Sequence, residues 1–323
     1  MKHILITGAC GYIGSHIALL LSQSDYMVVG IDLHLNAALS EKKNITLLQG
    51  DCTNQQFVTK LFEKYSFSAV IHCASLIEVH ESVINPEKYY HNNLLSTLTI
   101  LHAMRTHNVT KLIFSSSCAV YGTPHYLPLN EKHPELPISP YGKTKKIIEW
   151  MLHDFAGAYN LKTVALRFFN AAGGWYEHGL GENHEPESHL LPRLISAALT
   201  KKPIDIFGSN YPTLDGTCVR DFVSVGDIAR AHLATLHYLD AGGTPTAINL
   251  GSGRGHTLLQ IIHELEQQLG AQISINYKPR REGDPAILVA DATRAKELLN
   301  WTATDPLSAI VHQALRWNMK KAK

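Results

Sequence analysis

The chain has 323 residues, of which 45% are hydrophobic and 18% charged, enough to bury one large core or two smaller ones. The formal net charge of +1 excludes an electrostatic case for nucleic acid or an anionic membrane as partner. The apolar run at residues 4–6 is too short for a signal peptide, and no later run approaches the ~20 apolar residues of a membrane span.

The five cysteines are scattered and odd in number, which favours reduced thiols over disulfides or a zinc site. Together with the absence of a signal-like run, they lead us to expect a globular, cytoplasmic protein. No internal repeat or low-complexity linker interrupts the sequence.

A strand, a glycine loop and a helix open the chain. An apolar strand at residues 2–7 meets Gly8, Gly11 and Gly14, and a helical run follows. Glycines let backbone amides at a helix N-terminus approach a pyrophosphate, and Gly14 permits close packing of helix on strand. The spacing G-x-x-G-x-x-G is one residue longer in its first gap than the general dinucleotide fingerprint.

Asp32 ends the next buried strand, residues 27–31, eighteen positions beyond Gly14. A carboxylate at this place can accept both hydroxyls of an adenosine ribose, and it would repel a 2′-phosphate. No arginine follows to offset that repulsion, so the sequence favours NAD over NADP. A turn or capping role is the alternative for Asp32.

Strands and helices then alternate as far as residue 167. Strands are predicted at 45–50, 68–72, 111–115 and 163–167, and helices at 54–65, 86–107 and 140–159. The alternation predicts an α/β fold with a doubly wound parallel sheet of the Rossmann type. Ligands bind at the carboxyl ends of such strands, where Asp51, Ser75 and residues 115–117 fall.

Tyr141 and Lys145 lie four positions apart on one face of the helix that Ser139 caps and Pro140 begins. A phenol with a pKa of about 10 is a poor base at neutral pH. The lysine, the helix N-terminus and a bound cationic nicotinamide would each lower that pKa. A chance surface pair is the alternative, since Y-x-x-x-K recurs often.

Ser117 leaves the fifth strand within three consecutive serines. Its hydroxyl could bond both a substrate hydroxyl and the Tyr141 oxygen, although a plain serine turn explains the same stretch.

Residues 171–192 are glycine-rich and polar, which is typical of a binding loop. The loop carries seven potential metal ligands: Glu177, His178, Glu182, His184, Glu185, Glu187 and His189. No H-x-x-x-H or H-E-x-x-H spacing occurs among them, so we predict no metal site.

The C-terminal part contains three candidate phosphate ligands, Arg220, Arg280 and Arg281, for which surface salt bridges are the alternative. Arg281 and Asp284 bracket a glycine, where a phosphate and a sugar hydroxyl could sit together. A final amphipathic helix is predicted at 306–319.

These motifs together resemble the extended short-chain dehydrogenase/reductases. Residues 8–14, Ser117, Tyr141 and Lys145 carry this resemblance. Within that group the chain is similar, over nearly its whole length, to the UDP-hexose 4-epimerase family. The stretches that carry the closer similarity are 7–16, 139–145, 167–170, 211–217 and 279–284.

The resemblance implies an isomerase with tightly held NAD that interconverts UDP-glucose and UDP-galactose through a 4-keto sugar. Tyr141 would exchange a proton with the sugar 4-hydroxyl, Ser117 would bond that oxygen, and Lys145 would hold the nicotinamide ribose and keep Tyr141 acidic. The implied NAD contacts are Gly8, Gly11, Tyr12, Ile13, Gly14, Asp32, Asp51, Cys52, Cys73, Asn93, Tyr141, Lys145 and Phe169. The implied substrate contacts are Ser117, Asn170, His189, Leu190, Phe207, Arg220, Arg281, Asp284 and Leu288.

The same resemblance implies that two parts of the chain bind two different ligands. Residues 1–170, with a returning segment at about 221–250, would bind NAD. Residues 171–220 and 251–323 would form a smaller α/β domain for the sugar nucleotide. A homodimer through the helices at 86–107 and 140–159 is also implied.

Two positions depart from the family pattern. Ile77 stands where a lysine often meets the cofactor, which bears on NAD affinity. Leu288 stands where a tyrosine narrows the sugar pocket in enzymes strict for glucose and galactose, so N-acetylated hexosamines could enter.

Two other functions fit parts of the same pattern. A sugar-nucleotide 4,6-dehydratase shares the fold, NAD and the Tyr-Lys pair, but it usually carries an Asp-Glu pair where Cys118 and Ala119 stand here. A catalytically inactive NAD-sensing regulator would keep the fold without the chemistry. The presence of Ser117, Tyr141 and Lys145 argues against this alternative.

Overall fold

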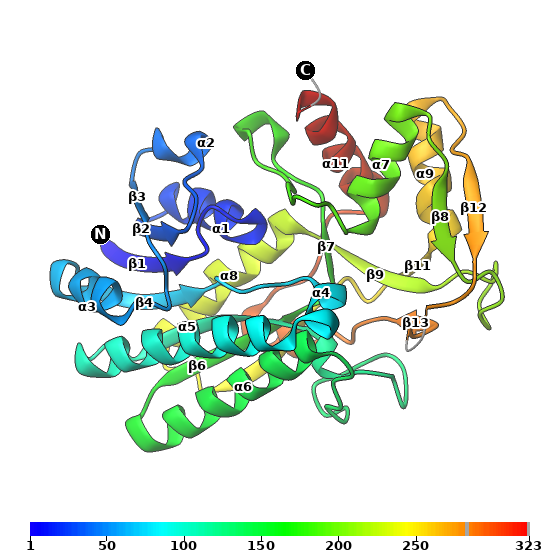
Figure 1. Ribbon diagram of the computed structural model, residues 1–323. Coiled ribbons are helices and arrows are strands. Elements are labelled where there is room, and N and C mark those ends of the chain that lie inside the picture. Colours follow the sequence, from blue (N-terminus) through cyan, green and yellow to red (C-terminus); the bar gives the residue numbers. More distant parts are fainter. Residues whose placement is uncertain (282–283, 322–323) are drawn as a thin grey trace.

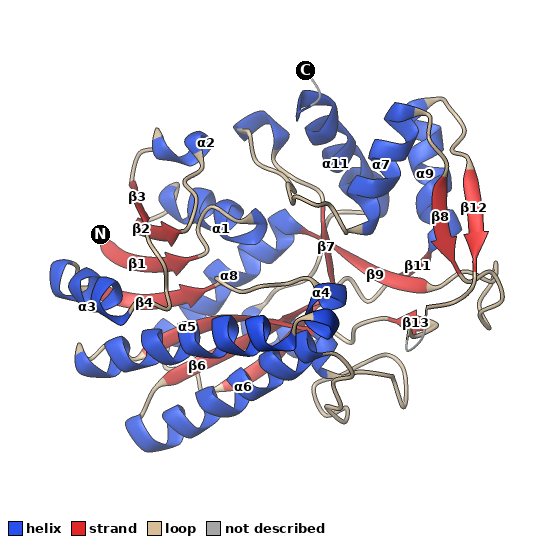
Figure 2. Cartoon of the chain, viewed as in Figure 1, coloured by secondary structure: helices blue, strands red, loops and turns tan. Residues whose placement is uncertain are grey.

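A computed structural model of the protein describes residues 1–281 and 284–321 (Figures 1 and 2). Its main sheet has seven strands in the order β10-β6-β5-β4-β1-β2-β3, and all neighbouring pairs run parallel. The strands are β1 (Lys2–Thr7), β2 (Tyr26–Asp32), β3 (Ile45–Gln49), β4 (Phe67–His72), β5 (Lys111–Ser117), β6 (Lys162–Phe168) and β10 (Thr246–Leu250). The predicted doubly wound α/β sheet is confirmed.

Helices cover both faces of this sheet because its strands are apolar on both sides. In β1, Ile4 and Ile6 face one core while Leu5 faces the other. The helices of the first face are α1 (Tyr12–Ser22) and α8 (Val225–Asp240); those of the second are α3 (Gln55–Lys64), α5 (Pro86–Thr106) and α6 (Pro140–Tyr159). The order of the strands reverses between β1 and β4, which is where such sheets bind their ligands.

A smaller group of elements lies beside the carboxyl ends of the main sheet, with its own apolar core around Leu194, Ile262 and Val311. Its strands are β7 (Asn170–Ala172), β8 (Ile204–Phe207), β9 (Val219–Ser224), β11 (Gly255–Thr257), β12 (Ile275–Lys278) and β13 (Ile287–Leu288). Its helices are α7 (Leu190–Thr200), α9 (Leu258–Leu269) and α11 (Leu307–Lys321). β9 is central, pairing with β7, β11 and β13.

The structure adds elements that sequence periodicity does not predict. Three are short helices: α2 (Ala37–Ser40), α4 (Val79–Ile84) and α10 (Thr293–Leu299). The predicted loop at 171–192 is partly regular, because β7 overlaps its first residues and α7 begins within it. β7 spans three residues and is held by β9, a partner some fifty positions away, so local pattern gives no sign of it.

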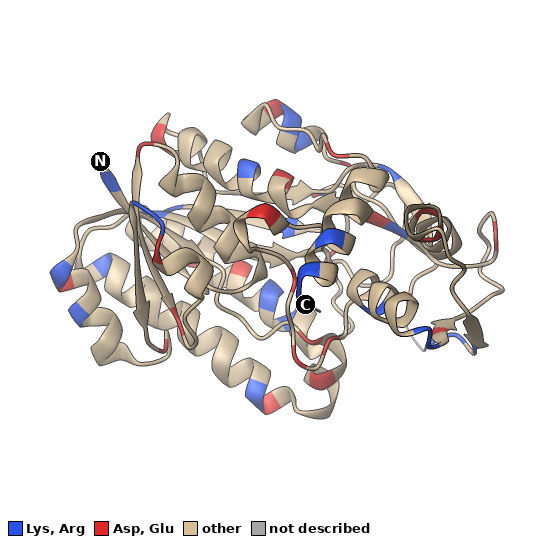
Figure 3. Cartoon of the chain, turned by 90° about the horizontal axis from the view of Figure 1, so that it is seen from above, with Lys and Arg blue, Asp and Glu red and all other residues tan. Residues whose placement is uncertain are grey.

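Residues of both charges alternate along the chain without gathering in one region of the ribbon (Figure 3). Among the described residues, no helix combines the length and the apolar character that crossing a membrane requires.

Three buried histidines make the fold sensitive to acid. Burial lowers the pKa of His16 and of His232 to about 4, and that of His72 to about 3. In the unfolded chain each imidazole has a pKa of about 6.5, which is higher than in the folded protein. The folded state therefore has its full stability above pH 6.5 and loses stability as the pH falls towards 4. We expect each of these histidines to lower the free energy of unfolding by about 1.4 kcal/mol for every pH unit below pH 6.

Urea unfolding at pH 7.0 and 5.0 measures this loss. His232→Met should make the free energy of unfolding fall less steeply with pH, by the contribution of one histidine. A matched His153→Ala change should leave the slope unaltered, because that imidazole is 89% exposed. Stability that is equal at the two pH values would contradict the assignment.

Candidate active site

The glycine loop forms a tight cradle between β1 and α1. Gly8 has a left-handed φ of +66°, and a Cβ placed on it would stand 2.7 Å from the Ala74 nitrogen. A Cβ on Gly14 would stand 2.0 Å from the carbonyl oxygen of Gly8. Gly11 caps α1 and offers no side chain to the first-turn amides. The N–H groups of the first turn are therefore free to donate to a bound anion, such as the pyrophosphate of a dinucleotide. The residues of the loop fit NAD in this respect.

Asp32 lies at the carboxyl end of β2 and is hydrogen-bonded to the glycine loop. One carboxylate oxygen accepts the Cys10 amide at 2.9 Å, and the other accepts the His34 amide at 3.4 Å. The turn role that the sequence offers as an alternative is therefore present. Tyr12 donates its hydroxyl to the carbonyl of Gly173 at 3.0 Å, which joins the loop to the segment after β7.

Two other predicted NAD contacts, Asp51 and Cys52, follow β3, and a third, Ile13, lies on α1. Asp51 is exposed and accepts the Thr53 amide at 2.8 Å. Burial raises the pKa of the Cys52 thiol to about 12, so this group is a neutral side chain. Ile13 is partly buried and packs on the first core.

Asn93 holds the segment that contains Ile77. Its side-chain oxygen accepts the Leu76 amide at 2.8 Å, and its nitrogen donates to the Leu76 carbonyl at 3.2 Å and to Thr144 at 3.1 Å. The side chain is 1% exposed. It therefore fixes the loop after β4 against α6.

Cys73 connects the glycine cradle to the Tyr-Lys helix. Its amide donates to the Thr7 carbonyl at 3.1 Å, and its sulfur accepts the Ser115 hydroxyl at 3.1 Å. The Lys145 ammonium donates to the Ser115 carbonyl at 2.8 Å. Burial raises the pKa of Cys73 to about 11. The predicted cofactor loop and the predicted catalytic pair therefore meet at one edge of the sheet.

Tyr141 and Lys145 lie on the first turns of α6, as the spacing predicts. The Ser139 side chain accepts the Gly142 amide at 3.1 Å and so caps the helix. The Lys145 nitrogen lies 5.7 Å from the centre of the Tyr141 ring and 4.8 Å from that of Phe114. Burial lowers the pKa of the Lys145 ammonium to about 8.

In the chain by itself, the Tyr141 phenol is less acidic than a free phenol. Burial raises the pKa of the phenol to about 12, and a hydrogen bond with Ser117 acts in the opposite direction. Desolvation disfavours the phenolate more than its neighbours in the chain favour it. A positive charge close to the phenol, such as that of an oxidised nicotinamide, would favour the phenolate.

A buried ionic network contacts Ser116, the neighbour of Ser117 on β5, and sequence reasoning missed it. The Arg167 guanidinium is 2% exposed and forms a two-pronged ion pair with Glu149, at 3.0 and 2.5 Å. Glu149 also accepts the Ser116 hydroxyl at 2.6 Å. Arg167 further donates to the Tyr121 hydroxyl at 2.9 Å. The sequence does carry one sign of this network, because Arg167 stands in a strand that is otherwise mainly apolar.

Several predicted substrate contacts gather around β9 and its neighbours. Leu288 pairs with Arg220 across β13 and β9, and it packs with Phe169 in a small apolar cluster. Asn170 donates to the Asp221 carbonyl at 3.0 Å. The Asp221 carboxylate, also missed from the sequence, accepts the amides of residues 252, 253 and 290 at 2.8 to 3.1 Å.

Arg220 and Asp284 pair with each other in this structure. Their side chains meet at 2.5 Å, and Arg220 also donates to the Pro285 carbonyl at 2.9 Å. Arg281 stacks over the Phe207 ring at 4.0 Å. The salt-bridge alternative is thus realised for Arg220. The residues between Arg281 and Asp284, including the predicted glycine, lie outside the described residues.

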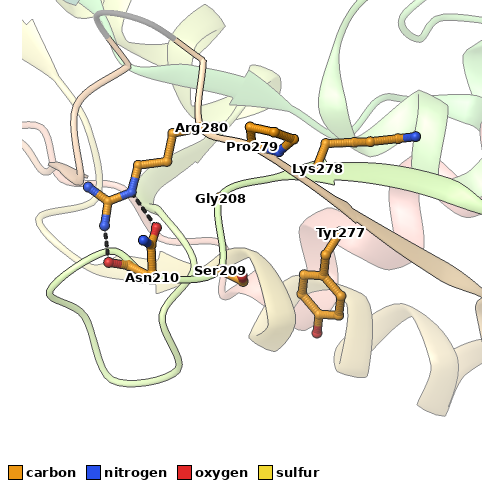
Figure 4. A pocket seen from close by; sticks show the side chains of 7 residues that line it. All are labelled: Gly208, Ser209, Asn210, Tyr277, Lys278, Pro279 and Arg280. Carbon is orange, nitrogen blue, oxygen red and sulfur yellow. Dashed lines mark hydrogen bonds between the residues drawn. The ribbon is translucent and has the colours of Figure 1, made fainter.

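A cavity of about 480 Å³ opens where β8 and β12 end (Figure 4). It is lined by Gly208, Ser209, Asn210, Tyr277, Lys278, Pro279 and Arg280. Arg280 donates to the Asn210 side chain at 2.7 Å and lies 4.2 Å from the Tyr211 ring centre. This hollow lies at the ends of β8 and β12, so it borders the predicted substrate residues and not Tyr141.

His189 and Leu190 lie where the polar loop enters α7. His189 is the N-cap residue, and its amide donates to the Glu187 carboxylate at 2.9 Å. Leu190 is partly buried against the third core.

Comparisons with known proteins agree with this geometry. Residues 4–251 match the model of the NAD dependent epimerase/dehydratase family. The UDP-glucose 4-epimerase of Rhizobium leguminosarum bv. trifolii is 40% identical over 318 residues, covering 98% of this chain and 97% of the relative.

Two solved structures superpose over nearly the whole chain. The UDP-glucose 4-epimerase from Brucella ovis in complex with NAD has a TM-score of 0.94 at 40% identity, with 98% of each chain covered. The UDP-Glc/GlcNAc 4-epimerase from Campylobacter jejuni has a TM-score of 0.87 at 35% identity, with 99% of this chain and 100% of the other covered.

Proposed function

This chain belongs to the NAD dependent epimerase/dehydratase family, and on that premise we propose that it is a UDP-glucose 4-epimerase. The enzyme is an isomerase that uses NAD and interconverts UDP-glucose and UDP-galactose through a 4-keto sugar. The observation that carries this proposal is the meeting of three groups at one sheet edge. The Lys145 ammonium binds the Ser115 carbonyl, Tyr141 lies beside Ser117, and Cys73 links both to the glycine cradle.

Each residue of this group has a distinct proposed task. The cradle at Gly8, Gly11 and Gly14 holds the pyrophosphate of NAD, which supplies the acceptor and donor of hydride for C4 of the sugar. The Tyr141 oxygen takes the proton of the sugar 4-hydroxyl and returns it after the sugar has turned its other face. Ser117 donates to the same sugar oxygen, and Lys145 keeps a positive charge near it.

The raised pKa of Tyr141 supports a base that works only in the loaded enzyme. At about 12, the phenol of the chain alone is protonated at neutral pH. A positive charge close to the ring favours the phenolate. Proton removal is thereby linked to the oxidised state of the cofactor, and the free chain does not carry a reactive base.

The two parts of the chain have separate proposed roles. Residues 1–170 with the returning segment at about 221–250 bind NAD, which is supported by the pairing of β10 with β6 and by the packing of α8 on α1. Residues 171–220 and 251–323 bind the sugar nucleotide, which is supported by two neighbouring arginines, Arg281 over the Phe207 ring and Arg280 over the Tyr211 ring.

Product identification tests the proposed activity. The purified enzyme is incubated with UDP-galactose, and the product is identified by NMR. UDP-glucose at an equilibrium ratio is expected. A 4-keto-6-deoxy sugar accumulating from UDP-glucose or dTDP-glucose would indicate a 4,6-dehydratase instead. No conversion by NAD-loaded enzyme would favour the inactive regulator.

Leu288 is the proposed determinant of sugar size, so UDP-N-acetylgalactosamine should also be converted. Leu288→Tyr fills space next to Phe169 and Arg220, and it should lower kcat/KM for this N-acetylated sugar by about tenfold or more. Turnover of UDP-galactose should stay within about threefold, because its 2-hydroxyl is smaller than an acetamido group. Parallel assays of both substrates measure the effect, and an equal loss for both would refute the role of Leu288.

The proposed assembly is a homodimer through α5 and α6. Three large apolar side chains of these helices are exposed: Leu98, Trp150 and Tyr159. Trp150→Glu should shift the mass measured by light scattering towards that of one chain. Leu214→Glu, at an 89% exposed site outside these helices, should not. A cytoplasmic location is also proposed, supported by five cysteines that are all free thiols.

A further inference from the structure

We propose that Glu182, His184, Glu187 and His189 form a binding site for a divalent transition-metal ion of the zinc class. These four residues, named here the His-Glu cluster, lie in the polar loop just before α7. The evidence for this inference is the geometry of these four residues and not that of the Tyr141 site, although His189 is also a proposed substrate contact.

The ligand atoms of the His-Glu cluster are close enough for one ion. All four lie within 4.8 Å of one another. The Nδ1 atom of His184 is 3.6 Å from Glu182 and 3.8 Å from Glu187, and that of His189 is 3.7 Å from Glu187. These three separations are near the value of about 3.4 Å that separates ligand atoms around tetrahedral zinc with bonds of about 2.1 Å.

The two imidazoles present nitrogen atoms to the carboxylates. Both Nδ1 atoms are shielded from solvent. His189 Nδ1 lies 2.6 Å from a Glu182 oxygen, and, although burial acts in the opposite direction, this carboxylate raises the pKa of the His189 imidazole. A metal ion would displace the proton from this nitrogen and take up its lone pair.

The charges of the cluster are compatible with a cation. The Glu182 side chain is 7% exposed, and the Glu187 carboxylate lies in the same group. Without a metal ion, protonated imidazoles can pair with these carboxylates. A divalent ion bound to both carboxylates and both neutral imidazoles would replace those protons and balance the same charge.

Neighbouring bonds already fix the ligands from outside. The Glu187 carboxylate accepts the His189 amide at 2.9 Å, and the Trp317 indole of α11 donates to the Glu182 carbonyl at 2.7 Å. Such outer bonds orient ligands in metal sites. Sequence spacing gave no sign of the site, because the loop and not a helix turn brings the four side chains together.

The ligand types select the metal and its role. Two imidazoles and two carboxylates suit zinc or a similar ion, whereas magnesium and calcium prefer oxygen ligands only. Four protein ligands close a tetrahedral site, so the ion would be structural. It would clamp the loop to the start of α7, where His189 and Leu190 are proposed to meet the substrate.

Direct metal measurement on the tag-free full chain tests the site. After EDTA treatment and its removal, ZnCl₂ and MgCl₂ are titrated separately by calorimetry, and bound metal is counted by mass spectrometry. One zinc per chain is expected, with no competition from magnesium. His184→Ala and Glu187→Gln should each weaken zinc binding by about tenfold or more. His153→Ala, at an exposed histidine on α6, should not.

Two further measurements separate the site from its alternatives. The melting temperatures of the metal-free variants show that they remain folded. The visible spectrum of a Co²⁺-loaded chain distinguishes histidine and carboxylate ligands from the five thiols, since only thiolates give a strong charge-transfer band.

Zinc binding that is absent, unaffected by His184→Ala, or accompanied by thiolate bands would overturn the proposal. The cluster would then be a network of ion pairs. The result is independent of the proposed activity, since UDP-galactose turnover is measured in a separate assay. Retained zinc without epimerisation would count against the proposed activity alone.

Discussion

Replacing Tyr141 with phenylalanine is expected to lower kcat for UDP-galactose at least ~100-fold, the usual contribution of a positioned acid–base group. The change removes the oxygen that would exchange the proton and leaves the ring, which is 9% exposed, in its packing. The NAD content of the purified variant should equal that of the unaltered enzyme. Turnover and cofactor content are measured on the same preparation.

Tyr159→Phe is the matched control, because this tyrosine lies on the same helix and is 45% exposed. It should retain full turnover. A Tyr141→Phe enzyme with unchanged kcat would show that another group moves the proton. A loss of bound NAD along with the rate would show instead that the hydroxyl serves binding.

Replacing Arg167 with methionine is expected to lower the free energy of unfolding by ~3–5 kcal/mol, because it strands the Glu149 carboxylate in the core. Arg167 is 2% exposed and Glu149 is 8% exposed at the side chain, so water cannot replace the lost partner. The Ser116 hydroxyl, next to Ser117, would remain as a donor to the stranded carboxylate. Urea unfolding at pH 7 measures the loss.

An exposed ion pair supplies the control for this prediction. Lys278 and Asp205 lie 3.9 Å apart with both side chains at least 40% exposed, so Lys278→Met should cost less than about 1 kcal/mol. Removing both buried charges, in Arg167→Met with Glu149→Met, should recover part of the lost stability. A single Arg167→Met change as mild as the exposed one would contradict the role of the network.

The elements of the main sheet are predictable from the sequence because their signals are local. A buried parallel strand is a short apolar run, and a capped helix begins at a serine or asparagine followed by proline, as at Ser139 and Asn85. The strand β10 is different, since its place at the sheet edge depends on a return of the chain after β9.

The resemblance to a known family supplied the residue roles that local chemistry leaves open. Glycine spacing indicates a dinucleotide, but it does not say which strand ends meet it. Cys73 and Asn93 carry no signal of their own, and their contacts with Ser115 and Leu76 appear only in the folded chain.

The sequence by itself determined the alternation of strands and helices, the glycine cradle, and the shared face of Tyr141 and Lys145, because backbone geometry fixes relations between residues a few positions apart. Only the tertiary structure decided that burial holds the pKa of Tyr141 at about 12, that Arg220 pairs with Asp284, and that Arg167 lies in the core. These properties depend on desolvation and on contacts between segments far apart in the chain. Packing of the whole fold sets both.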